Sequence, residues 1–480
     1  MQADPRTIAL QRFGLGARPG DLDITSETVR DVQSLLLADV STAQAPEALA
    51  GLADSAALYS ELLAVREARK AARLKSDVAP QPPEASVSDP TVAGGPKAGP
   101  GTGSKPAAAD VREGSIRRTV LDEISARIRI CREARIGFGE RLALFWANHF
   151  TVSATNATVR VLGGAFEREA IRPHLTGRFS DMLAAAESHP AMLIYLDNAR
   201  SMGPDSSAGQ RRGKGLNENL AREILELHTV GVDGGYTQAD VTTFAEAITG
   251  WSVVGPNGAE AHPGQFVFRQ GMHEPGAKHV LGRDYVAEGR QQGQEILGWL
   301  AVQPSTANHI AYKLVRHFIA DAPPAAAVDS VAQAFLRSSG ELMAVYEALL
   351  SLESALALPA TKLRLPIEYV YAGLRALDLD VPAPLLVRSL TLMGQPPGRA
   401  PSPQGWSDDS EAWTAPDGIR KRLELAQILA TRSSGVAPLQ RAKAVLGGLL
   451  SEQTGTAIAH AETVTQALVL LLMSPEFQRR

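Results

Sequence analysis

Apolar residues recur every three to four positions through most of this chain, the spacing of helices that bury one face. Alternation of apolar and polar residues, which is typical of strands, is confined to residues 265–281. The spacing predicts helices at 26–40, 54–75, 113–150, 163–187, 291–300, 306–320, 325–338, 341–352, 366–377, 418–430 and 459–472. The pattern therefore predicts a mainly α protein.

The alternating stretch, GQFVFRQGMHEPGAKHVLG, predicts one short β-hairpin. Its strands would be residues 265–269 and 278–281, with residues 272–276 at the tip. Glycine and proline bound the tip, so we expect little packing to depend on the side chain of His273. An exposed loop histidine is the alternative to a functional role for this residue.

Residues 76–110 contain almost no large apolar side chain and are rich in proline and glycine. Such a segment cannot bury enough surface to order itself, so we predict a disordered insertion. Helices on both sides need partners, and we expect residues 1–75 and 111–480 to fold together as one domain. A linker between independent domains is the alternative.

The polar chemistry is concentrated in residues 216–251, LNENLAREILELHTVGVDGGYTQADVTTFAEAITGW, which predict helix, glycine turn, helix. At 100° per residue one polar stripe runs along the first helix, formed by Asn219, Arg222, Glu223 and Glu226. Gly231 is suited to the position that ends this helix. Thr237 and Asp240 have the spacing of a capping box that starts the second helix.

Two interpretations of the polar stripe are open. Charged helix faces are ordinarily solvated and held by ion pairs within the helix. The rest of this helix is apolar over a wide arc, however, which indicates burial. In that case the stripe faces a cleft, where its amide and carboxylate groups around one arginine can bind a ligand or orient a proton donor.

Acid–base hydrolysis is one of two chemistries that these residues predict, beside metal ligation. Glu223 and Glu226 lie one helical turn apart, so their mutual repulsion can raise the pKa of one of them. His273 is the candidate second proton carrier, which gives Glu223, Glu226 and His273 as the predicted catalytic residues. The predicted substrate-binding residues are Asn148, Asn217, Asn219, Arg222, Tyr236, Trp251 and Lys278.

A divalent metal is the candidate cofactor, with His149, His228 and Asp240 as its predicted ligands. The chain has no HExxH motif, and the spacing of Glu226 and His228 does not place both on one helix face. Any metal site must therefore be assembled from separate segments. His149 ends a predicted helix, where a histidine is also typical as a partner of the helix dipole.

Composition and motifs exclude several classes of protein. The net charge is −4, so no basic field for nucleic acid is present. The single Cys131 excludes a disulfide framework, and no run of 18 apolar residues predicts a membrane span. The first residues lack the apolar core of a secretory signal, so we expect a cytoplasmic protein. The motifs of serine hydrolases, P-loop NTPases and Rossmann dehydrogenases are absent.

Several segments, in this order, resemble the bacterial domain-of-unknown-function family 1800: LQRFGLGARPGD, FWANHFTVS, HPAMLIYLDN, NENLAREILELHTVGVDGGYTQADV, HEPGAKHVLG, IAYKLVRHFIAD and LMSPEFQRR. Ala147 stands where that family often has a histidine. The resemblance implies a mostly helical fold and brings no reaction with it. Relatives often accompany a sulfatase-like family, which makes a protein of that family the candidate partner, and many of them look exported.

The residues together predict a hydrolase-type enzyme, with a divalent metal as candidate cofactor, whose polar cleft runs along helix 217–228. The alternative is a non-catalytic α-helical binding or scaffold protein. In that case Trp251, Trp406 and Trp413 would form a recognition surface for carbohydrate or peptide.

Overall fold

The computed structural model describes residues 4–23, 28–77, 108–212, 215–256, 262–356, 360–433 and 435–480. Within these ranges the chain is mainly α-helical with two small antiparallel sheets, which confirms the predicted fold class. Nearly all of the predicted disordered insertion, residues 76–110, lies outside the described residues.

The first part of the chain forms α1 (Pro5–Arg12), α2 (Val29–Thr42), α3 (Ser55–Asp77), α4 (Ala108–Glu133), α5 (Phe138–His149), α6 (Ala157–Phe166), α7 (Phe179–Ser188) and α8 (Pro190–Tyr195). The middle part forms α9 (Ser207–Arg212), α10 (Asn219–Glu223), α11 (Gln238–Ala247), α12 (Arg290–Leu300), α13 (Pro304–Phe318), α14 (Ala325–Arg337) and α15 (Leu342–Leu350). The last part forms α16 (Pro366–Leu377), α17 (Ala383–Leu392), α18 (Pro416–Arg432), α19 (Pro438–Leu446), α20 (Glu452–Ala459), α21 (Val464–Met473) and α22 (Pro475–Gln478).

Shorter helical segments join these elements. Two are π-helical, η2 (Glu167–Ile171) and η5 (Ile224–His228), and η5 continues α10 without a break. The short 3-10 turns are η1 (Glu47–Leu49), η3 (Arg172–His174), η4 (Asn198–Arg200), η6 (Gln270–Met272), η7 (Glu353–Leu356), η8 (Ser410–Trp413) and η9 (Gly447–Leu449).

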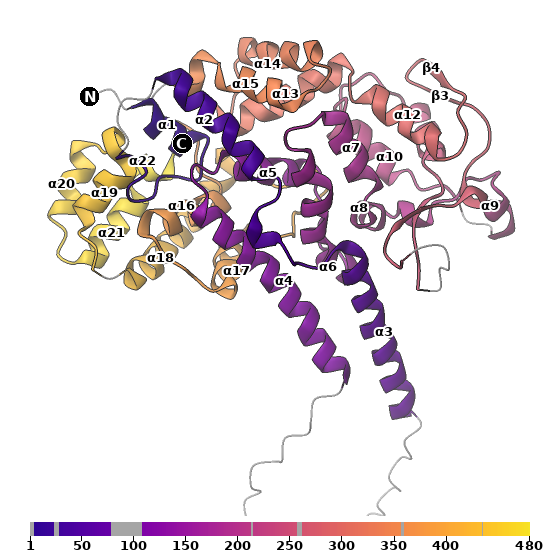
Figure 1. Ribbon diagram of the computed structural model, residues 1–480, viewed down its shortest axis with the longest axis horizontal. Helices are drawn as coiled ribbons and strands as arrows, with labels where there is room; N and C mark the ends of the chain where they lie inside the picture. The colour runs from indigo at the N-terminus through magenta and orange to yellow at the C-terminus, as the bar shows by residue number, and fades with distance from the viewer. Residues whose placement is uncertain are drawn as a thin grey trace, which may run out of the picture.

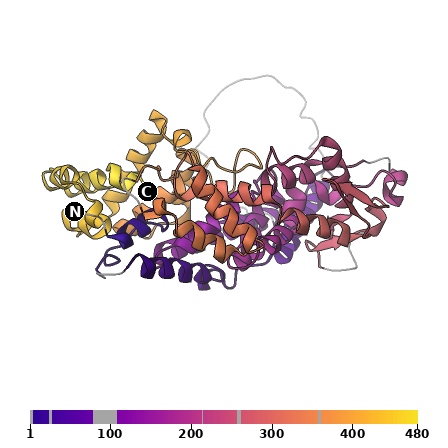
Figure 2. The same ribbon diagram turned by 90° about the horizontal axis from the view of Figure 1, so that it is seen from above.

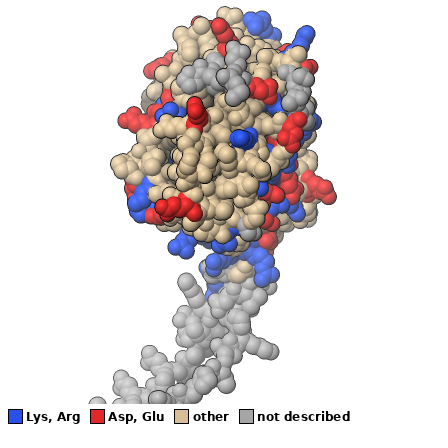
Figure 3. Space-filling model, turned by 90° about the vertical axis from the view of Figure 1, so that its left-hand side faces the viewer, with Lys and Arg blue, Asp and Glu red and all other residues tan. Residues whose placement is uncertain are grey.

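The helices form an elongated body, and α3 and α4 project from it together (Figure 1). Seen from above, α19–α21 lie at one end of the body and the strands lie toward the other (Figure 2). At the α19–α21 end, acidic and basic side chains are interspersed on a largely uncharged surface (Figure 3). In the described part of the chain, no helix is both long and apolar enough to span a membrane.

The N-terminal helices pack against helices from later in the chain. α2 contacts α5 and α15, and α3 contacts α4 and α6. Helices from residues 1–75 thus contact helices from residues 111–480, while their folding as one domain stays a prediction.

The strands pair differently from the predicted hairpin. β1 (Trp251–Val253) is antiparallel to β2 (Phe266–Phe268), and β3 (Lys278–Val280) is antiparallel to β4 (Arg283–Tyr285). The pairing of residues 265–269 with 278–281 is therefore wrong. The buried strand β1 takes β2 as its partner, and a two-residue turn with positive φ at Leu281 and Gly282 closes β3 onto β4.

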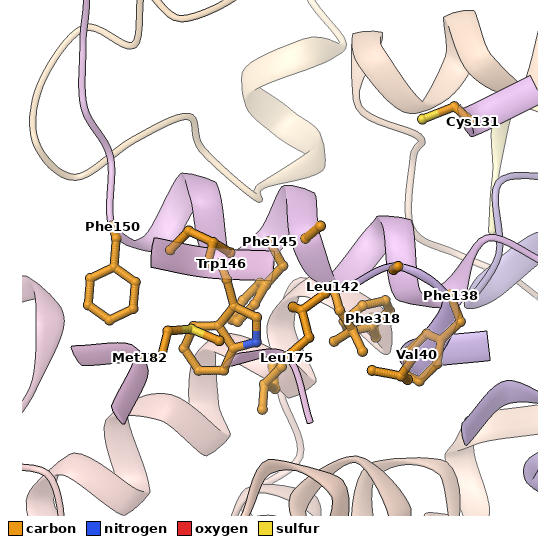
Figure 4. Packing of buried hydrophobic residues seen from close by; sticks show 14 of the residues in the cluster. Val40, Cys131, Phe138, Leu142, Phe145, Trp146, Phe150, Leu175, Met182 and Phe318 are labelled. Carbon is orange, nitrogen blue, oxygen red and sulfur yellow. The ribbon is translucent and has the colours of Figure 1, made fainter. Parts of the chain in front are cut away.

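α5 lies in the middle of the hydrophobic core and fixes the residues at its own end. Figure 4 shows its apolar side chains packed against residues of other elements: Phe138, Leu142, Phe145 and Trp146 against Val40, Leu175, Met182 and Phe318. The indole N–H of Trp146 donates a hydrogen bond to the Tyr346 hydroxyl at 2.7 Å. This packing holds Asn148 and His149 in defined positions.

Candidate functional site

The central helix is shorter and wider than predicted. It begins at Asn219 as α10 and changes after Glu223 into the π-helical turn η5, which ends at His228. Gly231 follows with a φ of +84°, as predicted for a residue that ends a helix. Isolated π-helical turns are uncommon and are frequent at functional sites.

Two histidines from other helices bind the end of this turn. His149 Nε2 lies 3.2 Å from the carbonyl oxygen of His228, and His309 Nε2 lies 3.0 Å from that of Leu227. Each ring must donate its N–H, because a carbonyl only accepts. Burial, assisted by the charge of Lys313, lowers the pKa of both rings, that of His309 to about 4. His149 is thus a neutral partner of helix carbonyls.

His228 projects from the turn into the interior beside a carboxylate that the sequence did not reveal. Both His228 and Glu187 of α7 are fully buried, and Nδ1 of His228 lies 2.8 Å from Oε1 of Glu187. The direction does not suit a hydrogen bond, so both nitrogens and both oxygens have no hydrogen-bond partner among the described residues. Buried polar groups in this state are rare and call for a functional or structural explanation.

Glu187 lies in the alanine-rich segment AAAESHP. A single acid after three alanines, followed by Ser188, His189 and Pro190, is the only signal that could have indicated it. Its partner is distant in sequence, so spacing alone could not bring the two together.

Most of the polar stripe is a surface network. Arg222 lies 3.1 Å from Glu218 and 3.6 Å from Glu226, and its side chain is 36% exposed. Glu218 also accepts hydrogen bonds from Thr242 and Gln238 of α11. For these residues the solvated-face interpretation holds, and the stripe as a whole does not face a buried cleft.

Glu223 is half-buried like Arg222 and Glu226, and it is distinguished within the stripe by its raised pKa. Burial raises the pKa of its carboxyl, and the negative charges of Glu226 and Glu187 act in the same direction, while His228 and Arg222 oppose them. Burial together with the charge of Glu223 raises the pKa of Tyr195 to about 12. Tyr236, predicted to bind substrate, hydrogen-bonds Glu226 and has a pKa raised to about 12, with burial as the larger cause. Glu223, Glu226, Tyr195 and Tyr236, here called the Glu223 cluster, thus lie together.

His273 is buried and packed, which contradicts both the expectation that little packing depends on it and the alternative of an exposed loop residue. Its side chain is 5% exposed and packs edge-on against Phe268, with ring centroids 5.4 Å apart. Nδ1 donates to the carbonyl oxygen of Thr249 at 3.1 Å, and burial lowers the pKa of the ring. The expectation failed because η6 and the loop after β2 fold back onto the end of α11.

Lys278 holds the loop that follows His273. It is 4% exposed, and its ammonium donates to the carbonyl oxygens of Glu274, Pro275 and Gly276 at 2.9 to 3.4 Å. Its Nζ lies 3.9 Å from Glu246, a residue that the sequence analysis did not single out. Burial raises the pKa of Glu246.

Other predicted substrate-binding residues have structural partners. The side-chain amide of Asn148 donates to the carbonyl oxygen of Trp406 at 2.9 Å and accepts from the backbone N–H of Trp406 at 2.7 Å. Trp251 is 2% exposed and packs on Phe266, so it belongs to the core and not to a recognition surface. Asn217 accepts a hydrogen bond from the backbone of Asn219 at the start of α10.

The predicted metal ligands do not converge. Asp240 forms the predicted capping box with Thr237 and also accepts from the backbone N–H of Leu281, so both of its oxygens are engaged. His149 and His228 are near each other, with ring centroids 5.8 Å apart. In the ranges that the structure describes, no three His, Cys, Asp or Glu side chains are arranged to hold a metal ion.

Two cavities are described, and the Glu223 cluster lines neither of them. One, of about 480 Å³, lies between the start of α6 and residues 399–400. The other, of about 400 Å³, lies between α2 and the end of α4. The Glu223 cluster is therefore a half-buried patch on the surface of α10 and η5.

Fold and site together define a mainly α-helical protein with a polar cluster on a π-helical turn. The chain belongs to the family described as "Protein of unknown function (DUF1800)", whose model matches residues 8–479. No curated protein and no solved structure gives a significant match. The family resemblance expected from the sequence is thus confirmed.

Proposed function

We propose that this protein is a hydrolase-type enzyme that uses acid–base catalysis at the Glu223 cluster. One observation carries the proposal: two carboxylates one turn apart have different surroundings. Burial, together with the charges of Glu226 and Glu187, favours the protonated form of Glu223 against the opposing effect of His228 and Arg222. Glu226 is paired with Arg222 and accepts the Tyr236 hydroxyl. Two carboxyl groups whose environments differ in this way are typical of an acid and base pair.

Hydrolysis assigns one role to each carboxyl group. Glu226 takes a proton from a water molecule as the water oxygen bonds to the substrate. Glu223 gives its proton to the leaving group as the bond to that group breaks, so the two products together contain the elements of water. Arg222 orients Glu226, and Tyr195 and Tyr236 provide hydroxyl groups to a polar substrate.

The proposal uses no metal ion, because donor side chains in the described ranges do not converge. His149 and His309 are already donors to helix carbonyls. His273 belongs to a separate cluster with Thr249 and Phe268. Its Nε2 makes no hydrogen bond among the described residues, so His273 is a candidate proton carrier of its own.

A binding function is the second candidate, supported by one observation. Trp406 and Trp413 are partly exposed, and their rings lie 6.1 Å apart at a 55° tilt. Partly exposed aromatic rings suit the apolar faces of sugars or peptide side chains. Because Trp251 is buried, this candidate surface consists of Trp406 and Trp413 without it.

Turnover of chromogenic esters, glycosides, amides and phosphoesters by the full-length protein tests the proposal. The wild type is expected to hydrolyse one class, and Glu223→Gln is expected to lose at least about 100-fold in kcat, the usual contribution of a general acid. Glu218→Gln is the matched control, since Glu218 lies directly before α10 but accepts hydrogen bonds from Thr242 and Gln238.

Equal loss in Glu223→Gln and Glu218→Gln would overturn the assignment of Glu223. Absence of turnover for all four classes, together with saturable sugar or peptide binding that Trp406→Ala abolishes, would favour the binding function instead.

A further inference from the structure

The cavity of about 480 Å³ beside α6 brings together two segments that are far apart in sequence. Its lining residues are Ser153, Ala154, Thr155, Asn156, Ala157, Arg160, Arg399 and Ala400. The backbone N–H of Ala154 donates to the carbonyl oxygen of Gly398 at 2.8 Å. The hydroxyl of Ser153, which is 6% exposed, donates to the carbonyl oxygen of Ala400 at 2.7 Å. These two bonds fix the walls of the cavity.

The charge of this cavity is entirely positive. Arg160 and Arg399 are both exposed, and within the described residues neither guanidinium has an ion pair or a hydrogen bond. None of the lining residues is acidic. Many arginines of this protein are instead paired with carboxylates or backbone carbonyls, as Arg172 is with Glu140. Two unpaired guanidinium groups that face one cavity are therefore available to an anion.

The end of α6 adds little to this charge. The side chain of Asn156 already accepts the N–H groups of Thr158 and Val159 at 3.0 Å each. The hydroxyl of Thr155 is exposed and makes no side-chain hydrogen bond among the described residues, so it is a further free donor. The two arginines and the shape of the cavity are what distinguish this place.

We propose that this cavity binds a tetrahedral oxyanion, phosphate or sulfate, either free or as the ester group of a small molecule. The planar guanidinium presents paired N–H donors that match the oxygens of such groups. The volume is in the range of small-ligand sites, and the absence of acidic lining residues leaves no charge that repels an anion. The site shares no residue with the Glu223 cluster, so the oxyanion proposal and the hydrolase proposal can be tested separately.

Isothermal titration of the full-length protein with inorganic phosphate, sulfate and a sugar phosphate tests the proposal, in a chloride buffer. Saturable binding is expected for the tetrahedral anions, weakened at least about tenfold in Arg160→Gln/Arg399→Gln. Arg388→Gln is the matched control, because Arg388 is an exposed arginine of α17 outside the cavity. All three arginines are exposed, and thermal unfolding confirms that the variants stay folded.

Tighter binding of the sugar phosphate would identify an ester of a small molecule as the ligand, and equal binding would identify the free anion. Either result supports the oxyanion site. Absence of saturable binding, or equal weakening by Arg388→Gln and by the double substitution, would overturn it.

Discussion

Glu223 and Glu226 have the same side chain and lie one turn apart, but their surroundings give them different chemistry. Glu226 has a cation and a hydroxyl as partners, whereas Glu223 has buried Glu187 behind it and Tyr195 beside it. The pKa of Glu218, the residue directly before α10, is lowered by hydrogen bonds from Thr242 and Gln238. Differences of this kind between neighbouring carboxyl groups arise from contacts across helices, which spacing along one helix cannot show.

Replacing His273 tests whether its ring has the buried contacts that the structure shows. His273→Ala removes a buried ring that packs on Phe268 and leaves the carbonyl oxygen of Thr249 without its donor. We expect a loss of roughly 1–3 kcal/mol in the free energy of unfolding, measured by chemical denaturation.

His279 provides the control, because its ring and its partner Asp284 are both more than 60% exposed. His279→Ala is expected to change stability by less than about 0.5 kcal/mol. Equal stabilities of the two variants would show that His273 does not have the buried contacts described here.

At the scale of elements, features set by residues within one turn of chain were predictable from the sequence. Features set by contacts between distant segments were not. Thr237 and Asp240 form the predicted capping box because both partners lie within one turn of chain. The pairing of residues 265–269 was wrong because its true partner, β1, lies outside the alternating stretch. The π-helical turn was not predicted either, since it depends on two histidines from α5 and α13 that bind its last carbonyls.

His149→Phe tests this capping of the central helix. Phenylalanine keeps the aromatic volume but has no N–H for the carbonyl oxygen of His228. A buried acceptor left without a donor costs roughly 1–3 kcal/mol of unfolding free energy. Chemical denaturation of the variant gives this difference directly.

The matched control is His460→Phe. His460 makes the same kind of contact, with Nδ1 2.9 Å from the Thr456 carbonyl oxygen, but at an exposed position. We expect His460→Phe to lose less than about 0.5 kcal/mol of unfolding free energy. A loss at His149 no larger than that at His460 would argue against a capping role.

Across the whole molecule, a buried ion network ties distant parts of the chain together. Glu368 of α16 lies 2.9 Å from Arg141 of α5 and 2.7 Å from Arg480, and all three are nearly fully buried. Arg480 also donates to the carbonyl oxygen of His317 on α13 at 2.7 Å. The sequence could not indicate this network, because charged residues are usually exposed to solvent and nothing along the chain marks these three as buried.

The network predicts sensitivity to acid. Burial raises the pKa of Glu368, but the charges of Arg141 and Arg480 more than offset it, so the pKa is held well below its usual range. A lowered carboxyl pKa adds stability that is complete above the unfolded-state pKa, about 4.3, and is lost as pH falls below it. Glu368→Gln is expected to lose roughly 3–5 kcal/mol at pH 7, because it leaves two buried cations without their carboxylate.

The difference in unfolding free energy between wild type and Glu368→Gln should shrink as pH falls below about 4. Chemical denaturation at a series of pH values measures this difference. Glu424→Gln is the control, since Glu424 and its partner Arg420 are both exposed, and it should cost under about 1 kcal/mol. A pH-independent difference for Glu368→Gln would contradict the network's role.

The most direct test of the central claim is the titration of Glu223 itself. Carbon-13 NMR of protein labelled at glutamate carboxyl groups, with signals assigned through Glu223→Gln and Glu218→Gln, gives both midpoints. Burial and neighbouring negative charge raise the pKa of Glu223, whereas hydrogen bonds lower that of Glu218. We therefore expect Glu223 to titrate at a higher pH than Glu218. A midpoint for Glu223 equal to or below that of Glu218 would contradict its assignment as the proton donor.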